Sequence, residues 1–148
     1  MAQYITIAEG TAIFLRVMNA DAWDDAATAS KTKAILASTD IIDRLNYEGE
    51  KADEDQVLQF PRDADTVVPD DIKTACAHIA LALLDDIDME IEFDNLSMVS
   101  QGISSIRATY RTNRVAEHIV AGVPSITAWR YLKPFLRDSN SVSVNRVS

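Results

Sequence analysis

The spacing of hydrophobic residues along the chain predicts a series of amphipathic helices. The first, residues 7–18, begins after Thr6, which has the spacing of a capping box with Glu9 in the first turn. It carries apolar residues on one side. A second helix is predicted over residues 23–45, where isoleucines and leucines recur at helical intervals among many alanines. The strongly acidic stretch at residues 48–56 interrupts this pattern and is predicted to be a surface loop.

The third predicted helix, residues 69–85, has the features of a central core element. Apolar residues recur along it from Ile72 onward at intervals of three and four, and Pro69 suits a first helical turn. A last helix is predicted at residues 125–136, where Pro134 removes one backbone hydrogen bond and should loosen the final turn. The residues expected to be largely buried are Ile35, Ile42, Ile79, Leu83 and Leu132.

Two further segments have patterns that are typical of strands. Acidic and apolar residues alternate strictly over residues 86–94, which favours a strand. Asp and Glu are poor strand formers, however, and the segment adjoins a strong helix, so a helix end is the alternative. Residues 96–112 are rich in β-branched and small polar residues around Gly102, which predicts a short β-hairpin.

The last eleven residues lack the composition of a core. Ser and Asn predominate in residues 138–148, yet Val142 and Val144 alternate with polar residues. That alternation suits strand addition to a partner, so this segment is predicted to be an extended docking tail. The predicted fold class is therefore mainly α, with a helical domain at residues 1–137 that contains about four helices and the hairpin, followed by the C-terminal tail.

Charge is distributed unevenly along the 148 residues, whose net charge is −9. Residues 1–94 hold seven Lys/Arg and twenty-one Asp/Glu, a net charge of −14, whereas residues 95–148 hold seven and two, a net charge of +5. The acidic total argues against a generic nucleic-acid binder, and the polarity suits contacts between the acidic part of one subunit and the basic part of the next. No stretch approaches the roughly 20 apolar residues of a membrane span, and no signal peptide is visible.

Candidate catalytic chemistry is sparse. The single cysteine, Cys76, excludes an internal disulfide and is expected to be a small core residue. His78 shares a helix face with carboxylates, the pattern of a structural histidine, and His118 follows Glu117 in a basic neighbourhood. The carboxylates of residues 85–94 could serve a hard cation but lack the spacing of a calcium loop. Because no nucleophile, zinc or phosphate-loop motif is present, the sequence predicts no enzymatic activity and no cofactor.

The run QVLQFPR, residues 56–62, lies between two predicted helices. Proline restricts Phe60 to an extended backbone, which would make its ring a hydrophobic pin that closes the helix pair. Together with other blocks, the run resembles the head–tail connector (adaptor) proteins of tailed bacteriophages, a group that includes sequences described as DnaT-like single-stranded-DNA-binding proteins. The blocks that carry this resemblance are residues 37–49, 56–62, 69–84, 100–102 and 122–136.

The resemblance implies a structural role. Such connector subunits form a homo-oligomeric ring, usually dodecameric, that docks under the portal protein, meets a tail or nozzle protein and lets double-stranded DNA pass. It also implies a place in the neck of the virion after synthesis in the bacterial host cytoplasm, and a helix end, loop and short helical turn at residues 85–94. Partner contacts are then expected at Phe60, Arg62, Arg107, Arg111, Arg130, Arg137, Val142, Val144 and Arg146.

The DnaT-like description implies a different function, the binding of single-stranded DNA by an accessory protein. The net charge weighs against it, but arginines beside aromatic residues suit single strands, because bases stack on rings while cations follow the backbone. The residues that favour this alternative are Arg107, Arg111, Arg114, Arg130 and Arg137, with Tyr110, Trp129 and Tyr131 nearby.

Overall fold

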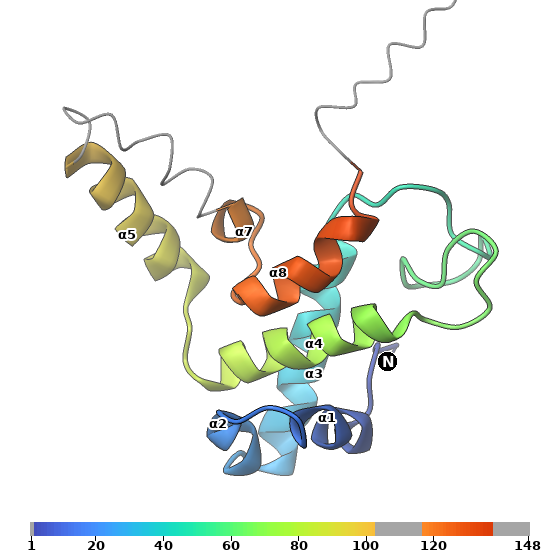
Figure 1. The fold of residues 1–148 in the computed structure, drawn as a ribbon, viewed down its shortest axis with the longest axis horizontal. Coiled ribbons are helices and arrows are strands. Elements are labelled where there is room, and N and C mark those ends of the chain that lie inside the picture. The colour runs from blue at the N-terminus through green and yellow to red at the C-terminus, as the bar shows by residue number, and fades with distance from the viewer. Residues whose placement is uncertain (1, 103–116, 138–148) are drawn as a thin grey trace, which may run out of the picture.

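Seven α-helices and one 3-10 helix form the described part of the protein (Figure 1). The computed structural model describes residues 2–102 and 117–137, and of residues 96–102 only the backbone. The elements are α1 (Ile7–Phe14), α2 (Asp21–Asp24), α3 (Thr28–Asp43), α4 (Asp70–Leu84), α5 (Met89–Gly102), α7 (Glu117–Val120), α8 (Ile126–Leu132) and η1 (Lys133–Phe135). The prediction of a mainly α protein is confirmed at this level.

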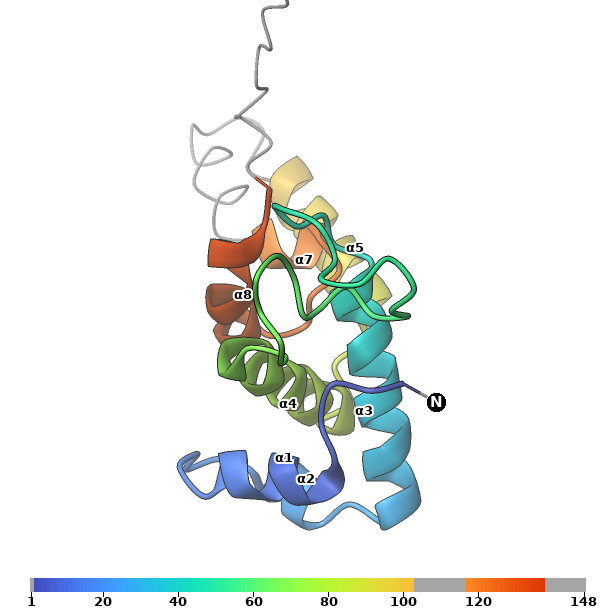
Figure 2. The same cartoon turned by 90° about the vertical axis from the view of Figure 1, so that its right-hand side faces the viewer.

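Helix α4 is the centre of the core. It packs against α3, α8 and the α1–α2 layer, which Figure 2 shows on different sides of it. Ala75, Ala77, Ala80 and Cys76 of this helix are fully buried, and these small side chains let the neighbouring helices approach closely. The predicted burial of four core residues is confirmed: Ile35, Ile42, Ile79 and Leu132. Leu83 is only half-buried, because it lies in the last turn of α4, where the neighbouring helices cover the helix incompletely.

The N-terminal layer is more broken than the hydrophobic spacing predicts. The capping box is present, with Thr6 and Glu9 each accepting a backbone N–H at 3.1 Å. The predicted helices at residues 7–18 and 23–45 become three, because a turn follows α1 and another separates α2 from α3. These turns place Trp23 in the core, 5.1 Å from Phe14 between ring centroids. Gly10 lies under the indole, where a Cβ atom would clash with the ring.

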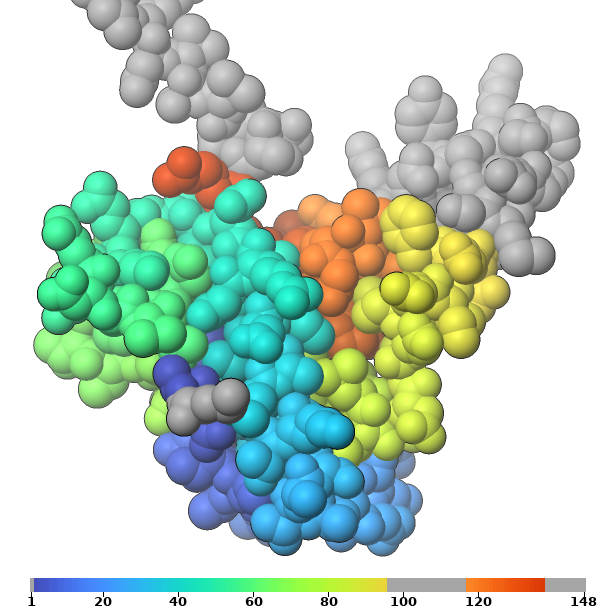
Figure 3. Space-filling model, turned by 180° about the vertical axis from the view of Figure 1, so that it is seen from behind, coloured from blue at the N-terminus to red at the C-terminus, as the bar shows by residue number. Residues whose placement is uncertain are grey.

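The loop between α3 and α4 is fixed by Phe60, which confirms the hydrophobic pin. The ring is 3% exposed and contacts three other aromatic rings, with centroid distances of 6.2 Å to Tyr4, 4.6 Å to Tyr47 and 5.6 Å to Phe135. The Tyr4 hydroxyl donates to the Asp43 carboxylate and accepts the Phe60 N–H at 3.3 Å. The loop is thereby tied to the N-terminus, to the end of α3 and to η1, and it flanks α3 on the side opposite α5 and α7 (Figure 3).

The segment at residues 85–94 is not a strand. Asp86 adopts a left-handed backbone with φ of 61°, and Asp88 accepts the Glu90 N–H at 2.9 Å at the start of α5. The helix end and loop expected here are confirmed, although the helix that follows has 14 residues rather than a single turn. The β-hairpin predicted over residues 96–112 is wrong as far as Gly102, where the chain is helical, and the remainder lies outside the described residues.

The last described elements follow their predicted chemistry. Ser125 caps α8 by accepting the Ala128 N–H at 3.2 Å, and Pro134 stands in η1, the loosened final turn. Figure 1 shows α5 extending away from the α3–α4 pair, with α7 between α5 and α8. The predicted docking tail at residues 138–148 lies outside the described residues.

Candidate functional site

Two of the predicted contact residues belong to the fold itself. The Phe60 side chain is enclosed by the core, so it is absent from the surface that a partner would meet. The Arg62 guanidinium donates from Nε to the Glu48 carbonyl at 2.9 Å and from Nη1 to the Gln59 Oε1 at 2.9 Å. It also lies over the Tyr47 ring, 5.9 Å from the centroid. Arg62 therefore uses its hydrogen bonds to hold the loop closed.

Two others are exposed at the C-terminal end of the described chain. Arg130 lies on α8 and Arg137 follows η1. Lys133, between them, bonds the Glu117 carboxylate at 3.1 Å, and both side chains of this pair are more than half exposed, so the pair contributes little stability. The five remaining contact residues lie outside the described part: Arg107, Arg111, Val142, Val144 and Arg146.

The aromatic residues named with these arginines differ in access to solvent. Trp129 is 8% exposed and its indole N–H points to Glu117 at 3.4 Å, so its faces are covered. Tyr131, two residues further along α8, is 37% exposed. Tyr110 lies outside the described residues. Tyr131 is thus the ring of this set that a base could stack on within the described chain.

Tyr131 forms one wall of a groove between α1, α4 and α8. Its ring stacks on the imidazole of His78, with an interplanar angle of 13° and a centroid distance of 6.3 Å. Phe14 contacts the His78 ring edge-on, with a centroid distance of 6.0 Å. The groove has a volume of about 540 Å³, and Arg16, from the turn after α1, lines it together with Thr74 of α4 and short aliphatic side chains.

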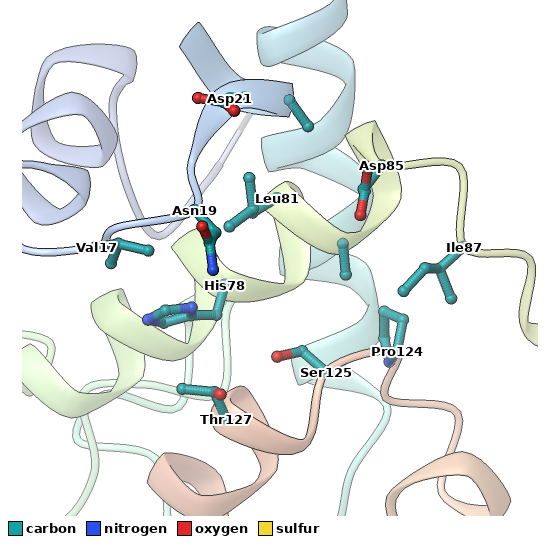
Figure 4. A pocket seen from close by; sticks show the side chains of 12 residues that line it. Val17, Asn19, Asp21, His78, Leu81, Asp85, Ile87, Pro124, Ser125 and Thr127 are labelled. Atoms are coloured by element: carbon teal, nitrogen blue, oxygen red, sulfur yellow. The ribbon is translucent and has the colours of Figure 1, made fainter.

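A second cavity of about 460 Å³ continues from the first along α4, and the two share Val17 and His78. Figure 4 shows His78 and Leu81 of α4 between the α1–α2 turn on one side and the start of α8 on the other. Its polar side chains include two carboxylates, those of Asp21 and Asp85. The continuous groove therefore has a cationic, aromatic end and an acidic end.

The protonation of His78 follows from its surroundings. Burial lowers the pKa of its imidazole below the ordinary value of 6.5, because the charged form loses hydration there. At neutral pH the ring is thus an uncharged stacking partner, and Arg16 supplies the positive charge at that end. Burial raises the pKa of the Cys76 thiol to about 12, so this cysteine is inert at neutral pH, as expected of a core residue.

Hydrophobic side chains also reach the surface at several points. Leu15 and Met18 are 83% and 96% exposed in the turn after α1. On α5, Ile91 and Phe93 are about half exposed. Such residues are available for contacts between protein subunits, since burial of apolar surface is the main driving force of association.

Neither a metal-ion site nor a membrane-spanning helix is present among the described residues. No three His, Cys, Asp or Glu side chains there converge in a way that would hold a metal ion. No helix of the described chain is long and apolar enough to cross a membrane.

The groove escaped the sequence-based prediction of binding residues. Arg16 and Tyr131 lie near opposite ends of the chain, and only the packing of α1 and α8 on α4 brings them together. His78 was assigned a structural role beside carboxylates, whereas its nearest ring neighbours are Tyr131 and Phe14. A histidine in an otherwise apolar stretch of α4 was the one local signal, and it does not by itself distinguish a packed ring from a groove wall.

These features describe a small helical protein with an open aromatic groove and an exposed cationic end. The chain belongs to the family described as "Putative DnaT-like ssDNA binding protein", whose model matches residues 3–147. No curated protein and no solved structure matches the chain.

Proposed function

We propose that this protein binds single-stranded DNA as an accessory factor, through the surface around α8. The observation that carries the proposal is membership of a family with that description over nearly the whole chain. The basic character of residues 95–148 supports it, because backbone phosphates are attracted to Lys and Arg. Exposed Arg130 and Arg137 flank Tyr131 in this region.

The charge distribution restricts where the strand would lie. Residues 1–94 carry a net charge of −14 and would repel a phosphate backbone. The strand would therefore contact the C-terminal third of the chain and leave most of the N-terminal surface free. Affinity governed by a limited number of cations is expected to be moderate and to fall with salt at a rate set by that number.

The test is fluorescence anisotropy of a labelled oligothymidine over a range of salt concentrations, with a duplex of equal length for comparison. We expect salt-sensitive binding that favours the single strand. Replacement of Arg130 and Arg137 by Glu should weaken it at least about tenfold. The matched control replaces Lys33 and Arg44, exposed residues of α3 and its C-cap, by Glu, which changes the net charge equally. No binding at low salt, or equal losses in both double variants, would reject the proposal.

A second candidate is a structural head–tail connector subunit of a tailed phage, with a passive role and no catalysis. The resemblance in residues 56–62 and 122–136 suggests it. The exposed apolar residues Leu15 and Met18 favour it independently, because a ring of subunits would bury such surface. In this function the partners are further copies of the chain, a portal protein and a tail or nozzle protein, and the location is the virion neck.

The connector function is tested by imaging and by mass in solution. Rings on portal-bearing heads, seen by electron microscopy, would support it, and a small oligomer that binds oligonucleotides but not heads would oppose it. In a ring whose acidic and basic surfaces meet, the Arg130→Glu, Arg137→Glu variant should assemble poorly while its monomer stays folded, since repeated rim charge pairs contribute up to about 1 kcal/mol each. Truncation after Arg137 should abolish attachment to heads without changing the melting temperature.

A further inference from the structure

We propose that the groove between α1, α4 and α8 binds one nucleobase of a single strand, on the ring of Tyr131, with the adjoining phosphate on Arg16. The inference rests on the proposed single-stranded-DNA function and assigns it a site. Three observations carry it: a stacked pair of rings at the surface, a cation beside them that has no ion-pair partner among the described residues, and a cavity of suitable size.

The ring pair is a ready stacking surface. Tyr131 and His78 lie nearly parallel, and Tyr131 remains more than a third exposed. His78 contacts Phe14 edge-on and lies on the central helix α4, and these contacts restrict its ring before a base arrives. Stacking on a fixed ring is favourable for every base, because each base has a flat apolar face.

Arg16 supplies the charge that a phosphate requires. It lines the same cavity and is exposed. The ion pairs among the described residues join Lys73 to Glu9 and Lys133 to Glu117, so no described carboxylate neutralises Arg16. A guanidinium can bind phosphate oxygens through two parallel N–H donors, and it needs no protonation change at neutral pH.

The shape of the groove limits the ligand to a single inserted base. About 540 Å³ lies within the usual range of small-molecule sites. Beyond His78 the groove becomes acidic, with Asp21 and Asp85, and a phosphate backbone would be repelled from that end. The strand therefore crosses the mouth of the groove instead of following it. A base in a duplex is paired and stacked, so this site selects single strands.

The test compares labelled oligothymidine with an oligonucleotide of the same length whose sugars lack bases. Tyr131→Ala should weaken binding of oligothymidine about tenfold and leave binding of the abasic strand unchanged, since only the base meets the ring. Arg16→Glu should weaken binding of both strands. Tyr131→Phe keeps the ring and should recover most of the affinity for oligothymidine that Tyr131→Ala loses. Arg44→Glu makes the same charge change as Arg16→Glu away from the groove and serves as the control; circular dichroism confirms folding.

The outcomes separate the site from the function. If the parent protein binds oligothymidine and the Arg16 and Tyr131 variants bind equally well, the site is wrong while the proposed function stands. If Tyr131→Ala weakened binding of oligothymidine and of the abasic strand equally, the site would also be wrong, because the ring would then act without contacting a base. If the parent protein does not bind single strands at low salt, the proposed function fails first and this inference falls with it.

Discussion

Two aromatic clusters in this molecule each combine a tyrosine, a second ring and an arginine, and they differ in almost every other respect. The rings of Tyr4, Tyr47 and Phe135 each contact the buried Phe60 ring, and the Arg62 guanidinium is bonded to the loop that it covers. At the groove, Tyr131 lies open to solvent on His78. The groups of the first cluster are satisfied by contacts within the protein, whereas the Tyr131 ring of the second remains available to a ligand.

The difference separates stability from binding. Closed rings and bonded donors lower the free energy of the folded state, because apolar area leaves water and each polar group keeps a partner. An exposed ring beside a cation that no carboxylate of the described residues pairs with contributes little to folding, but the ring face and the charge are available to a ligand. Variants in the first cluster should therefore change unfolding, and variants in the second should change binding alone.

The largest expected effect is that of Phe60→Ala. It should lower the free energy of unfolding by about 3–5 kcal/mol, because the lost ring leaves a cavity among three other rings. Tyr131→Ala should lower it by less than about 1 kcal/mol, since that ring is partly exposed. Urea unfolding followed by circular dichroism measures both. Phe60→Leu, which fills part of the space, should fall between them, and equal losses at Phe60 and Tyr131 would erase the distinction between the clusters.

A smaller effect is expected from removing one hydroxyl from each cluster. Tyr4→Phe leaves the buried Phe60 N–H without its acceptor and removes a donor from Asp43, which should cost about 1–3 kcal/mol. Tyr131→Phe should cost close to nothing. Both changes conserve the ring, so packing is matched and only the hydrogen bonds differ. An unchanged urea midpoint in Tyr4→Phe would show that the hydroxyl network is dispensable.

The closed cluster was largely visible in the sequence, whereas the open one was not. The sequence of residues 56–62 predicts that proline holds Phe60 as a hydrophobic pin. The spacing of apolar residues from Ile72 onward predicts the central helix α4. Both predictions use neighbours in the chain. The groove depends on how α1 and α8 pack over α4, and no local pattern links Arg16 to Tyr131.

Tertiary packing also explains the wrong helix bounds and the missing hairpin. The single helix predicted at residues 23–45 breaks because Trp23 turns into the core, a long-range contact with Phe14 that helix periodicity does not contain. Strand propensity in residues 96–102 describes a pleated, half-buried surface, and it gives way because these residues continue α5, which starts at Met89 just after Asp88 accepts the Glu90 N–H.

Arg62 and Arg16 provide the third test, in which the expected changes in the free energy of unfolding are smaller. Arg62→Ala should lower the free energy of unfolding by about 1–2 kcal/mol, because several loop carbonyls lose a charged donor while staying partly hydrated. Arg62→Lys should restore little, since a single ammonium does not reproduce the fork of donors. Arg16→Ala should leave the urea midpoint unchanged. A stable Arg62→Ala protein would mean that the loop is held by Phe60 alone.

The smallest effect concerns pH and His78. Burial lowers the pKa of this imidazole, so the folded state binds fewer protons than the unfolded state near pH 6. The associated stability is complete above the unfolded pKa of 6.5 and is lost as pH falls through the lower folded value. The parent protein should therefore lose stability more steeply between pH 7.5 and about 5 than His78→Phe, which keeps a ring in the stack and has no proton to bind.

The difference between the two proteins isolates the contribution of His78, because every other titratable group is common to both. The charged groups that share the groove with His78 are Arg16 at one end and Asp21 and Asp85 at the other. NMR titration of the His78 ring reports the same pKa directly. Adding oligothymidine should raise it, because a phosphate on Arg16 favours the imidazolium next to it. The prediction is wrong if the free energy of unfolding depends on pH in the same way in both proteins, or if the His78 ring titrates at its ordinary value. Either result would mean that His78 is hydrated and does not form a wall of the groove.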